Sequence, residues 1–91
     1  VWQLLEHPDF ARYQTSSLTS VAIGGAAAGP ELFARLARRL PQVVAATGYG
    51  ATETSGGCTF NGGLDYAAFP ASVGVPAPIV DVKVVDQHGV D

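Results

Sequence analysis

Eleven consecutive residues carry most of the side chains that could do chemistry in this sequence. The segment from Thr47 to Gly57 holds four glycines, one tyrosine, one carboxylate and four other hydroxyl side chains. Glycine lets the backbone approach a ligand closely, hydroxyl and free N–H groups suit phosphate oxygens, and a ring can stack on a base. The lone carboxylate is Glu53, and Mg²⁺ is often bound by one or two carboxylates together with substrate phosphates. The segment therefore predicts a nucleotide-phosphate loop, although its composition alone leaves open a mobile glycine loop without a ligand.

Two common phosphate-binding motifs do not fit the glycines of this chain. Residues 24–29 have the four-residue gap of a P-loop, but Pro30 and Glu31 stand where that motif needs lysine and serine or threonine. The stretch that begins at Gly48 starts like G-x-G-x-x-G, but Glu53 replaces the third glycine, which close packing of helix on strand requires. The pattern thus argues against both a P-loop and a Rossmann dinucleotide site.

The elements that lead into the segment predict a βαβ unit. Residues 18–23 and 43–46 are short apolar runs, and residues 30–40 between them have helical spacing. This order predicts two parallel strands joined by a right-handed crossover. Because Gly24 follows the first strand and Gly48 follows the second, both glycine segments are expected at one edge of the sheet. Open α/β sheets bind ligands at that edge.

The flanking stretches carry weaker signals. Residues 1–6 have helical spacing, and residues 61–63 contain the Asn-Gly-Gly signature of a turn. Residues 80–85 alternate in a way that predicts a half-buried strand, and residues 86–89 fit a type I turn. The expected fold class is α/β: part of a mostly parallel sheet with a βαβ unit, followed by a β-rich C-terminal stretch that ends within a hairpin.

Length and composition limit the classes of protein that this chain can represent. The 91 residues suit one small unit, with an α/β part in residues 1–57 and a β-rich part in residues 58–91. Both ends interrupt a pattern, so a piece of a larger protein is expected. The net charge of -3 argues against a nucleic-acid partner, and no apolar run approaches the roughly 20 residues of a transmembrane helix. A single cysteine, Cys58, fits a reducing compartment and hence a cytoplasmic location.

Charge is concentrated on the predicted central helix. Three of the five basic residues, Arg35, Arg38 and Arg39, lie on it away from its apolar side. We expect them to form a solvated face.

Three segments resemble one known family. Gly48-Tyr49-Gly50-Ala51-Thr52-Glu53 is similar to the Tyr-Gly-x-Thr-Glu signature of adenylate-forming (AMP-binding) enzymes, which include acyl-CoA synthetases, peptide-synthetase adenylation domains and luciferases. Residues 24–26 resemble the Gly-Gly-Ala segment that precedes this signature. Residues 72–76 and 82–86 resemble the stretch that follows it. The matches occur in the family's order, cover most of residues 18–91, and are most similar to acyl-CoA synthetases of the fatty-acid or aryl-acid type.

The resemblance implies a two-step reaction with ATP, Mg²⁺ and coenzyme A. A small carboxylic acid would attack the α-phosphate of ATP to give an acyl-adenylate and pyrophosphate, and a thiol would then accept the acyl group. By resemblance, Tyr49 stacks on adenine, Thr52 bonds the α-phosphate and Glu53 binds Mg²⁺, so Thr52 and Glu53 would be the catalytic residues. The nucleotide (ATP or AMP) and substrate contacts that the family implies are Gly25, Ala26, Thr47, Gly48, Tyr49, Gly50 and Thr52.

Each of these assignments has a structural alternative. Tyr49 could be a core ring, Thr52 could cap a helix, and Glu53 could serve only a helix dipole. Cys58 is expected to be a small buried hydrophobe rather than a nucleophile. The family's phosphate-loop lysine, ribose-binding aspartate and catalytic lysine have no match here, so the 91-residue chain is expected to be inactive alone. The alternatives at the level of function are another nucleotide-binding α/β domain and a non-catalytic module that self-associates through an open sheet edge.

Overall fold

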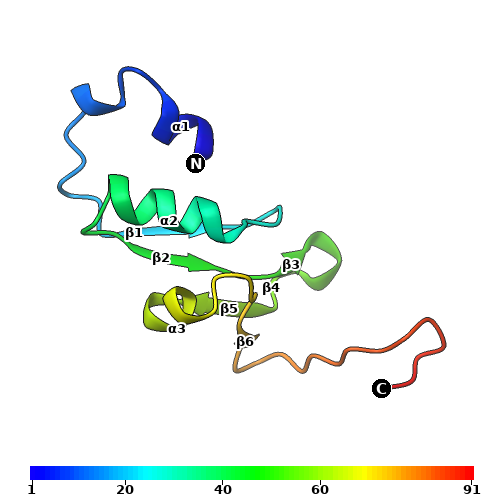
Figure 1. The fold of residues 1–91 in the computed structure, drawn as a ribbon. Coiled ribbons are helices and arrows are strands. Elements are labelled where there is room, and N and C mark those ends of the chain that lie inside the picture. The colour runs from blue at the N-terminus through cyan, green and yellow to red at the C-terminus, as the bar shows by residue number, and fades with distance from the viewer.

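A computed structural model describes all of residues 1–91. It contains a small mixed sheet, helices packed on it and, after residue 76, an extended C-terminal arm formed by residues 77–91 (Figure 1). The molecule is elongated, with principal extents of 52 × 23 × 22 Å. In chain order the elements are α1 (Trp2–Glu6), the 3₁₀ helix η1 (Phe10–Arg12), β1 (Ser20–Ile23), α2 (Pro30–Arg39), β2 (Val44–Thr47), β3 (Gly50–Ala51), the 3₁₀ helix η2 (Thr52–Thr54), β4 (Gly56–Gly57), β5 (Thr59–Gly62), α3 (Gly63–Ala68) and β6 (Val75–Pro76).

The βαβ unit forms as the sequence predicts. Strands β1 and β2 are parallel, with Ser20 opposite Val44 and Ile23 opposite Thr47. Their connection is α2, which begins with Pro30 in its first turn and ends one residue before Leu40. The α/β class is confirmed, and the sheet is mixed: in the order β1-β2-β5-β6, the pairs β2–β5 and β5–β6 are antiparallel.

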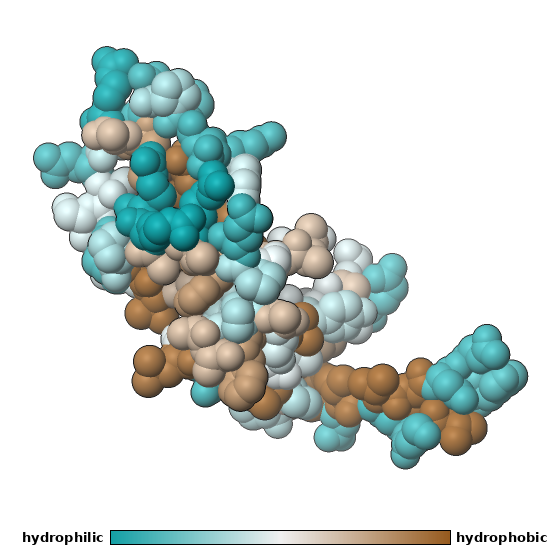
Figure 2. Space-filling model, viewed as in Figure 1, coloured by the Kyte–Doolittle hydropathy of each residue, from teal (hydrophilic) through white to brown (hydrophobic).

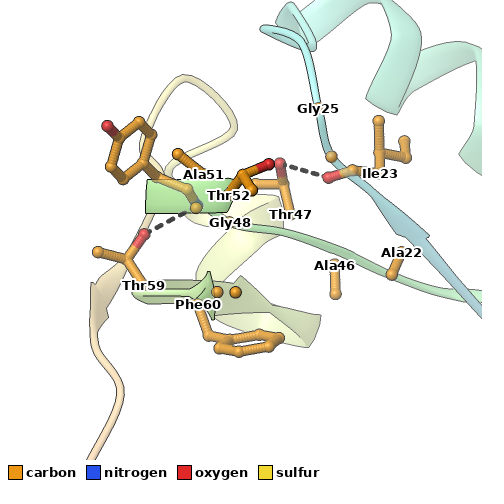
Figure 3. Close-up of a pocket in the computed structure, with 15 residues that line it drawn as sticks. Ala22, Ile23, Gly25, Ala46, Thr47, Gly48, Ala51, Thr52, Thr59 and Phe60 are labelled. Carbon is orange, nitrogen blue, oxygen red and sulfur yellow. Dashed lines mark hydrogen bonds between the residues drawn. The ribbon is translucent and has the colours of Figure 1, made fainter. Parts of the chain in front are cut away.

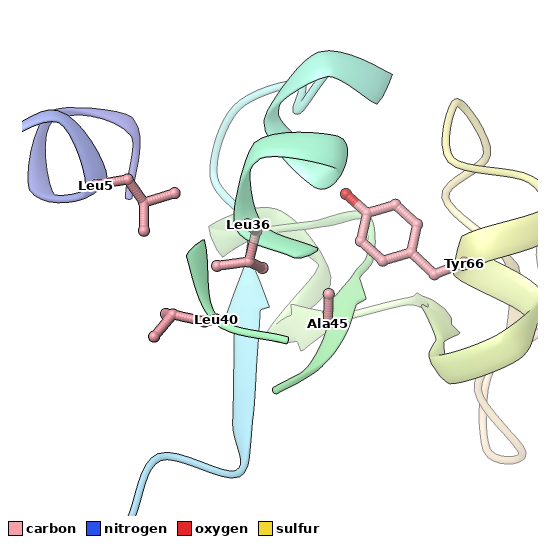
Figure 4. Packing of buried hydrophobic residues seen from close by; sticks show 5 residues of the cluster. All are labelled: Leu5, Leu36, Leu40, Ala45 and Tyr66. Atoms are coloured by element: carbon pink, nitrogen blue, oxygen red, sulfur yellow. The ribbon is translucent and has the colours of Figure 1, made fainter. Parts of the chain in front are cut away.

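One face of this sheet carries the hydrophobic core. Leu36 and Leu40 from the α2 region meet Ala45 of β2, while Leu5 arrives from α1 and Tyr66 from α3 (Figure 4). Tyr66 is fully buried, and its ring centroid lies 4.7 Å from that of Phe33. Helices α2 and α3 are therefore held against β2 by one small apolar cluster, and α1 joins the cluster by packing on α2.

Helix α1 is fastened to α2 by an arginine that we expected in solvent. The Arg35 guanidinium pairs with Glu6 and lies 4.1 Å from the centroid of the Trp2 ring. Its side chain is only 24% exposed. The prediction of a solvated face is wrong for Arg35 because α1 folds back over this part of α2. It holds for Arg38, which is exposed.

The C-terminal third departs from the sequence prediction in two places. The turn expected at residues 61–63 is a strand-to-helix junction, because β5 runs through Gly62 and α3 begins at Gly63. Residues 80–85 form no strand. A half-buried strand needs a neighbouring strand and an apolar surface to cover, and no strand pairs with this arm.

The C-terminal arm leaves the body of the molecule as an exposed run of apolar residues (Figures 1 and 2). Ile79 is 95% exposed and Val84 is 87% exposed. The turn expected at its end does form, with the Gly89 N–H donating to the Asp86 carbonyl oxygen at 3.1 Å. None of the helices is long and apolar enough to cross a membrane.

Candidate nucleotide site

Two adjoining cavities lie where β1 and β2 end. The larger cavity has a volume of about 540 Å³ and the smaller one about 330 Å³. Gly25, Thr47, Gly48, Tyr49 and Gly50 line both cavities. The parallel pairing of β1 and β2 therefore brings the two glycine segments together, as the sequence predicts.

Each cavity also has walls of its own. On one side the larger cavity is lined by Thr59 and Phe60 of β5 and by residues 51, 52, 56 and 57 (Figure 3). Ala46 and Phe60 point to the same side of the sheet there, away from the core (Figure 3). The smaller cavity extends from Ala26 to the loop at residues 70–73. Ala26 and Tyr49 thus share one crevice.

The loop after β2 is packed so tightly that it requires glycine at two positions. A Cβ atom on Gly48 would overlap the carbonyl oxygen of Thr59, and one on Gly50 would overlap the carbonyl oxygen of Gly56. Both obstacles are backbone atoms, which cannot rotate away as a flexible side chain could. The spacing of these two glycines therefore follows from contact with β5 and with the β3–β4 hairpin as well as from any contact with a ligand.

Tyr49 is held by its backbone and leaves its ring free. Its N–H donates to the Thr59 hydroxyl at 3.0 Å. Its carbonyl oxygen accepts from the N–H groups of Cys58 at 2.7 Å and Thr59 at 3.1 Å. The residue is 56% exposed, so it is not a core ring. A fixed backbone with an accessible ring is an arrangement that can stack on a base.

The hydroxyl groups of the loop divide into two kinds. Thr47 donates to the carbonyl oxygen of Ile23 at 3.0 Å, which ties β2 to β1 (Figure 3). The Thr54 hydroxyl accepts from the Ala51 N–H at 2.9 Å and lies 2.8 Å from the carbonyl oxygens of Ala51 and Gly56. Thr52 is the first residue of η2 and lines the larger cavity, and its hydroxyl makes no hydrogen bond within the chain. Among these three threonines, Thr52 is the one whose hydroxyl is both at the cavity and uncommitted to the backbone.

Glu53 lies apart from the cavity walls. It is exposed, occupies the first turn of the three-residue η2, and lines neither cavity. Because η2 is so short, stabilisation of a helix dipole is a weak reason for a carboxylate here. Its chain neighbour Thr52 does line the larger cavity, so Glu53 is one residue away from the cavity wall along the chain.

The donor set suits a metal that arrives with its own oxygen ligands. The structure contains no cluster of three or more His, Cys, Asp or Glu side chains that could hold a metal ion. Mg²⁺ is commonly bound through one or two carboxylates plus substrate phosphates and waters. A single carboxylate, Glu53, one residue after Thr52 in the chain, is compatible with that mode.

Sequence reasoning missed two polar residues that shape the site. Thr59 and Asn61 of β5 are 6% and 3% exposed. The Asn61 amide donates to the carbonyl oxygens of Phe69 at 3.0 Å and Ser72 at 2.9 Å, which fixes the loop that walls the smaller cavity. Alternation in the sequence could not have identified them, because it predicts the apolar Phe60 on the covered face of the strand, whereas Phe60 is 60% exposed. Cys58 is buried, as expected.

Comparison with known proteins agrees with this geometry. The chain matches the AMP-binding enzyme family over residues 1–91. It is 36% identical over 83 residues to 4-coumarate–CoA ligase-like 6 of Oryza sativa subsp. japonica, covering 91% of this chain and 14% of that protein. It is 32% identical over 83 residues to 4-coumarate–CoA ligase-like 5 of the same organism, covering 91% of this chain and 15% of that protein.

A third relative comes from another plant. Identity to 4-coumarate–CoA ligase-like 9 of Arabidopsis thaliana is 33% over 75 residues, which is 82% of this chain and 13% of that protein. The chain thus spans a small part of each relative's length. Since the family match extends over the whole sequence, this chain belongs to the AMP-binding enzyme family.

Proposed function

We propose that the chain is the part of an acyl-CoA synthetase that holds the adenylate. The complete reaction would join a carboxylic acid to AMP at the expense of ATP and then transfer the acyl group to coenzyme A. The observation that carries the proposal is the meeting of the Gly25 and Gly48 segments at a cavity of about 540 Å³. That volume lies within the range of roughly 300–1,000 Å³ that is typical of small-molecule sites.

Each of three residues at or beside this cavity would contact a different part of the nucleotide. Tyr49 offers a largely exposed ring on a fixed backbone, and base stacking on a ring contributes about 1–3 kcal/mol per base. Thr52 offers a free hydroxyl for the α-phosphate, where negative charge accumulates during attack by the carboxylate. Glu53 would hold Mg²⁺ together with phosphate oxygens, and that ion would supply charge neutralisation.

The smaller cavity supports an assignment for the acid. It shares Gly48 and Tyr49 with the larger cavity and continues between Ala26 and the loop at residues 70–73. An acyl group attached to the α-phosphate near Thr47 and Gly48 would enter this space. The fatty-acid or aryl-acid preference, the use of coenzyme A and a cytoplasmic location remain proposals, the last supported by the single cysteine.

Ligand titration of the chain tests the proposal. A non-hydrolysable acyl-adenylate analogue is expected to shift the NMR signals of Gly25, Gly48 and Tyr49, whereas NAD⁺ is not. Tyr49→Ala should weaken binding of the analogue about tenfold or more, because the stacking surface is lost. The matched control is Tyr13→Ala, since Tyr13 is 72% exposed and lines neither cavity.

Two outcomes would defeat the assignment: equal binding of NAD⁺ and the adenylate analogue, or equal effects of the Tyr49 and Tyr13 substitutions.

Turnover by the chain is tested separately. The 91-residue chain, given ATP and a panel of carboxylic acids, is expected to release no pyrophosphate. We expect pyrophosphate release only from a longer polypeptide that contains these residues.

A further inference from the structure

Thr59 links a residue that lines both cavities to the wall of the smaller one. Its side chain is buried on the covered face of β5. Its hydroxyl accepts a hydrogen bond from the Tyr49 N–H at 3.0 Å and donates one to the Val73 carbonyl oxygen at 2.7 Å. Thr59 lines the larger cavity, Val73 lines the smaller one, and Tyr49 lines both.

This hydroxyl is the only group of the Thr59 side chain that can hydrogen-bond, and it is used in both directions. One lone pair and its single proton join two segments that are 24 residues apart in the sequence, at Tyr49 and Val73. The backbone N–H of Thr59 makes a third bond, to the Tyr49 carbonyl oxygen at 3.1 Å. Thr59 therefore bonds both the N–H and the carbonyl oxygen of Tyr49, and the Cys58 N–H supplies a further bond to that carbonyl oxygen at 2.7 Å.

We propose that Thr59 is a positioning residue that sets the Tyr49 ring for the adenine base through the bond to the Tyr49 N–H. The proposal rests on the adenylate site described above. A valine at this position would have nearly the same shape as threonine, but it could neither accept the hydrogen bond from the Tyr49 N–H nor donate one to the Val73 carbonyl oxygen. Serine would keep both bonds.

The first test is an NMR titration with AMP of wild-type chain, Thr59→Val and Thr59→Ser. Loss of the hydroxyl should weaken AMP binding about tenfold, and serine should restore it to within about threefold of the wild type. Thr19→Val is the matched control, because Thr19 is exposed and lies outside both cavities. Failure of serine to restore binding would overturn the proposal.

A double substitution separates positioning from general destabilisation. If Thr59 acts through the ring, Thr59→Val should have no further effect on AMP affinity in a Tyr49→Ala background. Equal weakening in both backgrounds would show that Thr59 merely stabilises the chain, and the proposal would be rejected.

A third measurement keeps the proposal testable if the chain does not bind AMP. The amide proton of Tyr49 should exchange with solvent about tenfold faster in Thr59→Val, while that of Ala45 in β2 should be unchanged. Absence of AMP binding with this exchange pattern would defeat the adenylate assignment and leave the positioning of Tyr49 intact. An unchanged Tyr49 exchange rate would defeat the positioning itself.

Discussion

Gly48→Ala offers the sharpest test of how the nucleotide loop is built. The added Cβ atom would overlap the carbonyl oxygen of Thr59 and lie 3.3 Å from its carbonyl carbon and 3.7 Å from the Cα atom of Phe60. All three obstacles belong to the backbone of β5, so the strand or the loop must move. Either movement stretches the hydrogen bonds that Tyr49 makes with Cys58 and Thr59.

The cost follows from two contributions. Overpacking against a rigid neighbour costs about 1–3 kcal/mol, and loss of one backbone hydrogen bond adds about 1 kcal/mol. We therefore expect Gly48→Ala to lower the free energy of unfolding by about 2–4 kcal/mol, which is roughly a 30- to 700-fold change in the unfolding constant. AMP affinity should fall as well, because Tyr49 moves with the loop.

Gly24→Ala is the matched control, with an effect of opposite sign. Gly24 lines the same cavity as Gly48, but a Cβ atom there would meet no atom within 4 Å. Replacing glycine by alanine where the backbone tolerates it stabilises by about 0.4–1 kcal/mol, since the unfolded chain loses freedom. Urea unfolding followed by far-ultraviolet circular dichroism would measure both variants. The reasoning is refuted if Gly48→Ala matches the wild type, or if both substitutions destabilise equally.

Three further predictions concern other parts of the fold. Tyr66→Phe should raise the free energy of unfolding by about 1 kcal/mol in urea titrations, because the buried Tyr66 hydroxyl has no hydrogen-bond partner and its burial raises the pKa of the phenol; a less stable variant would reveal a partner. Asn61→Ala should cost about 2–3 kcal/mol in the same assay and speed amide exchange at Ser72, since Asn61 donates to Phe69 and Ser72; unchanged exchange would contradict this. Backbone N–H groups of Val90 and His88 donate to the Asp86 carboxylate and hold its pKa below the ordinary 3.8. The carboxylate bonds should therefore stabilise the turn fully above pH 3.8, and the turn should open as the pH falls through the lowered pKa of Asp86 in the folded chain. A carboxyl ¹³C titration that gave Asp86 an ordinary or raised pKa would contradict this.

The central unit was predictable because its signals are local. The apolar runs before Gly24 and Gly48 and the helical spacing between them specify strand, helix and strand without reference to the rest of the chain. The meeting of the two glycine segments then follows from parallel pairing alone. The membership of Tyr49 and Thr52 in one cavity could be expected on the same grounds.

The remaining features depend on contacts between distant segments. Helix α3 has only six residues, and its place in the core is set by Tyr66 packing against Phe33 of α2. The side chain of Arg35 is covered because α1 folds back over it. Conversely, the alternating pattern of residues 80–85 predicts a strand, but pairing requires a neighbour that this arm does not have. Periodicity indicates which conformation a segment prefers, whereas a strand also needs a partner.

The same distinction bears on the nucleotide loop. The types and spacing of Tyr49 and Thr52 indicate what could be bound, but the orientation of the Tyr49 ring depends on its peptide group, which is held by Thr59. The Thr59 hydroxyl is in turn held by Val73, whose carbonyl oxygen accepts its hydrogen bond. Two chains with an identical loop could therefore differ in AMP affinity if one of them lacked a hydroxyl at the position of Thr59. Affinity for the base is thus a property of the loop together with β5 and the wall of the smaller cavity.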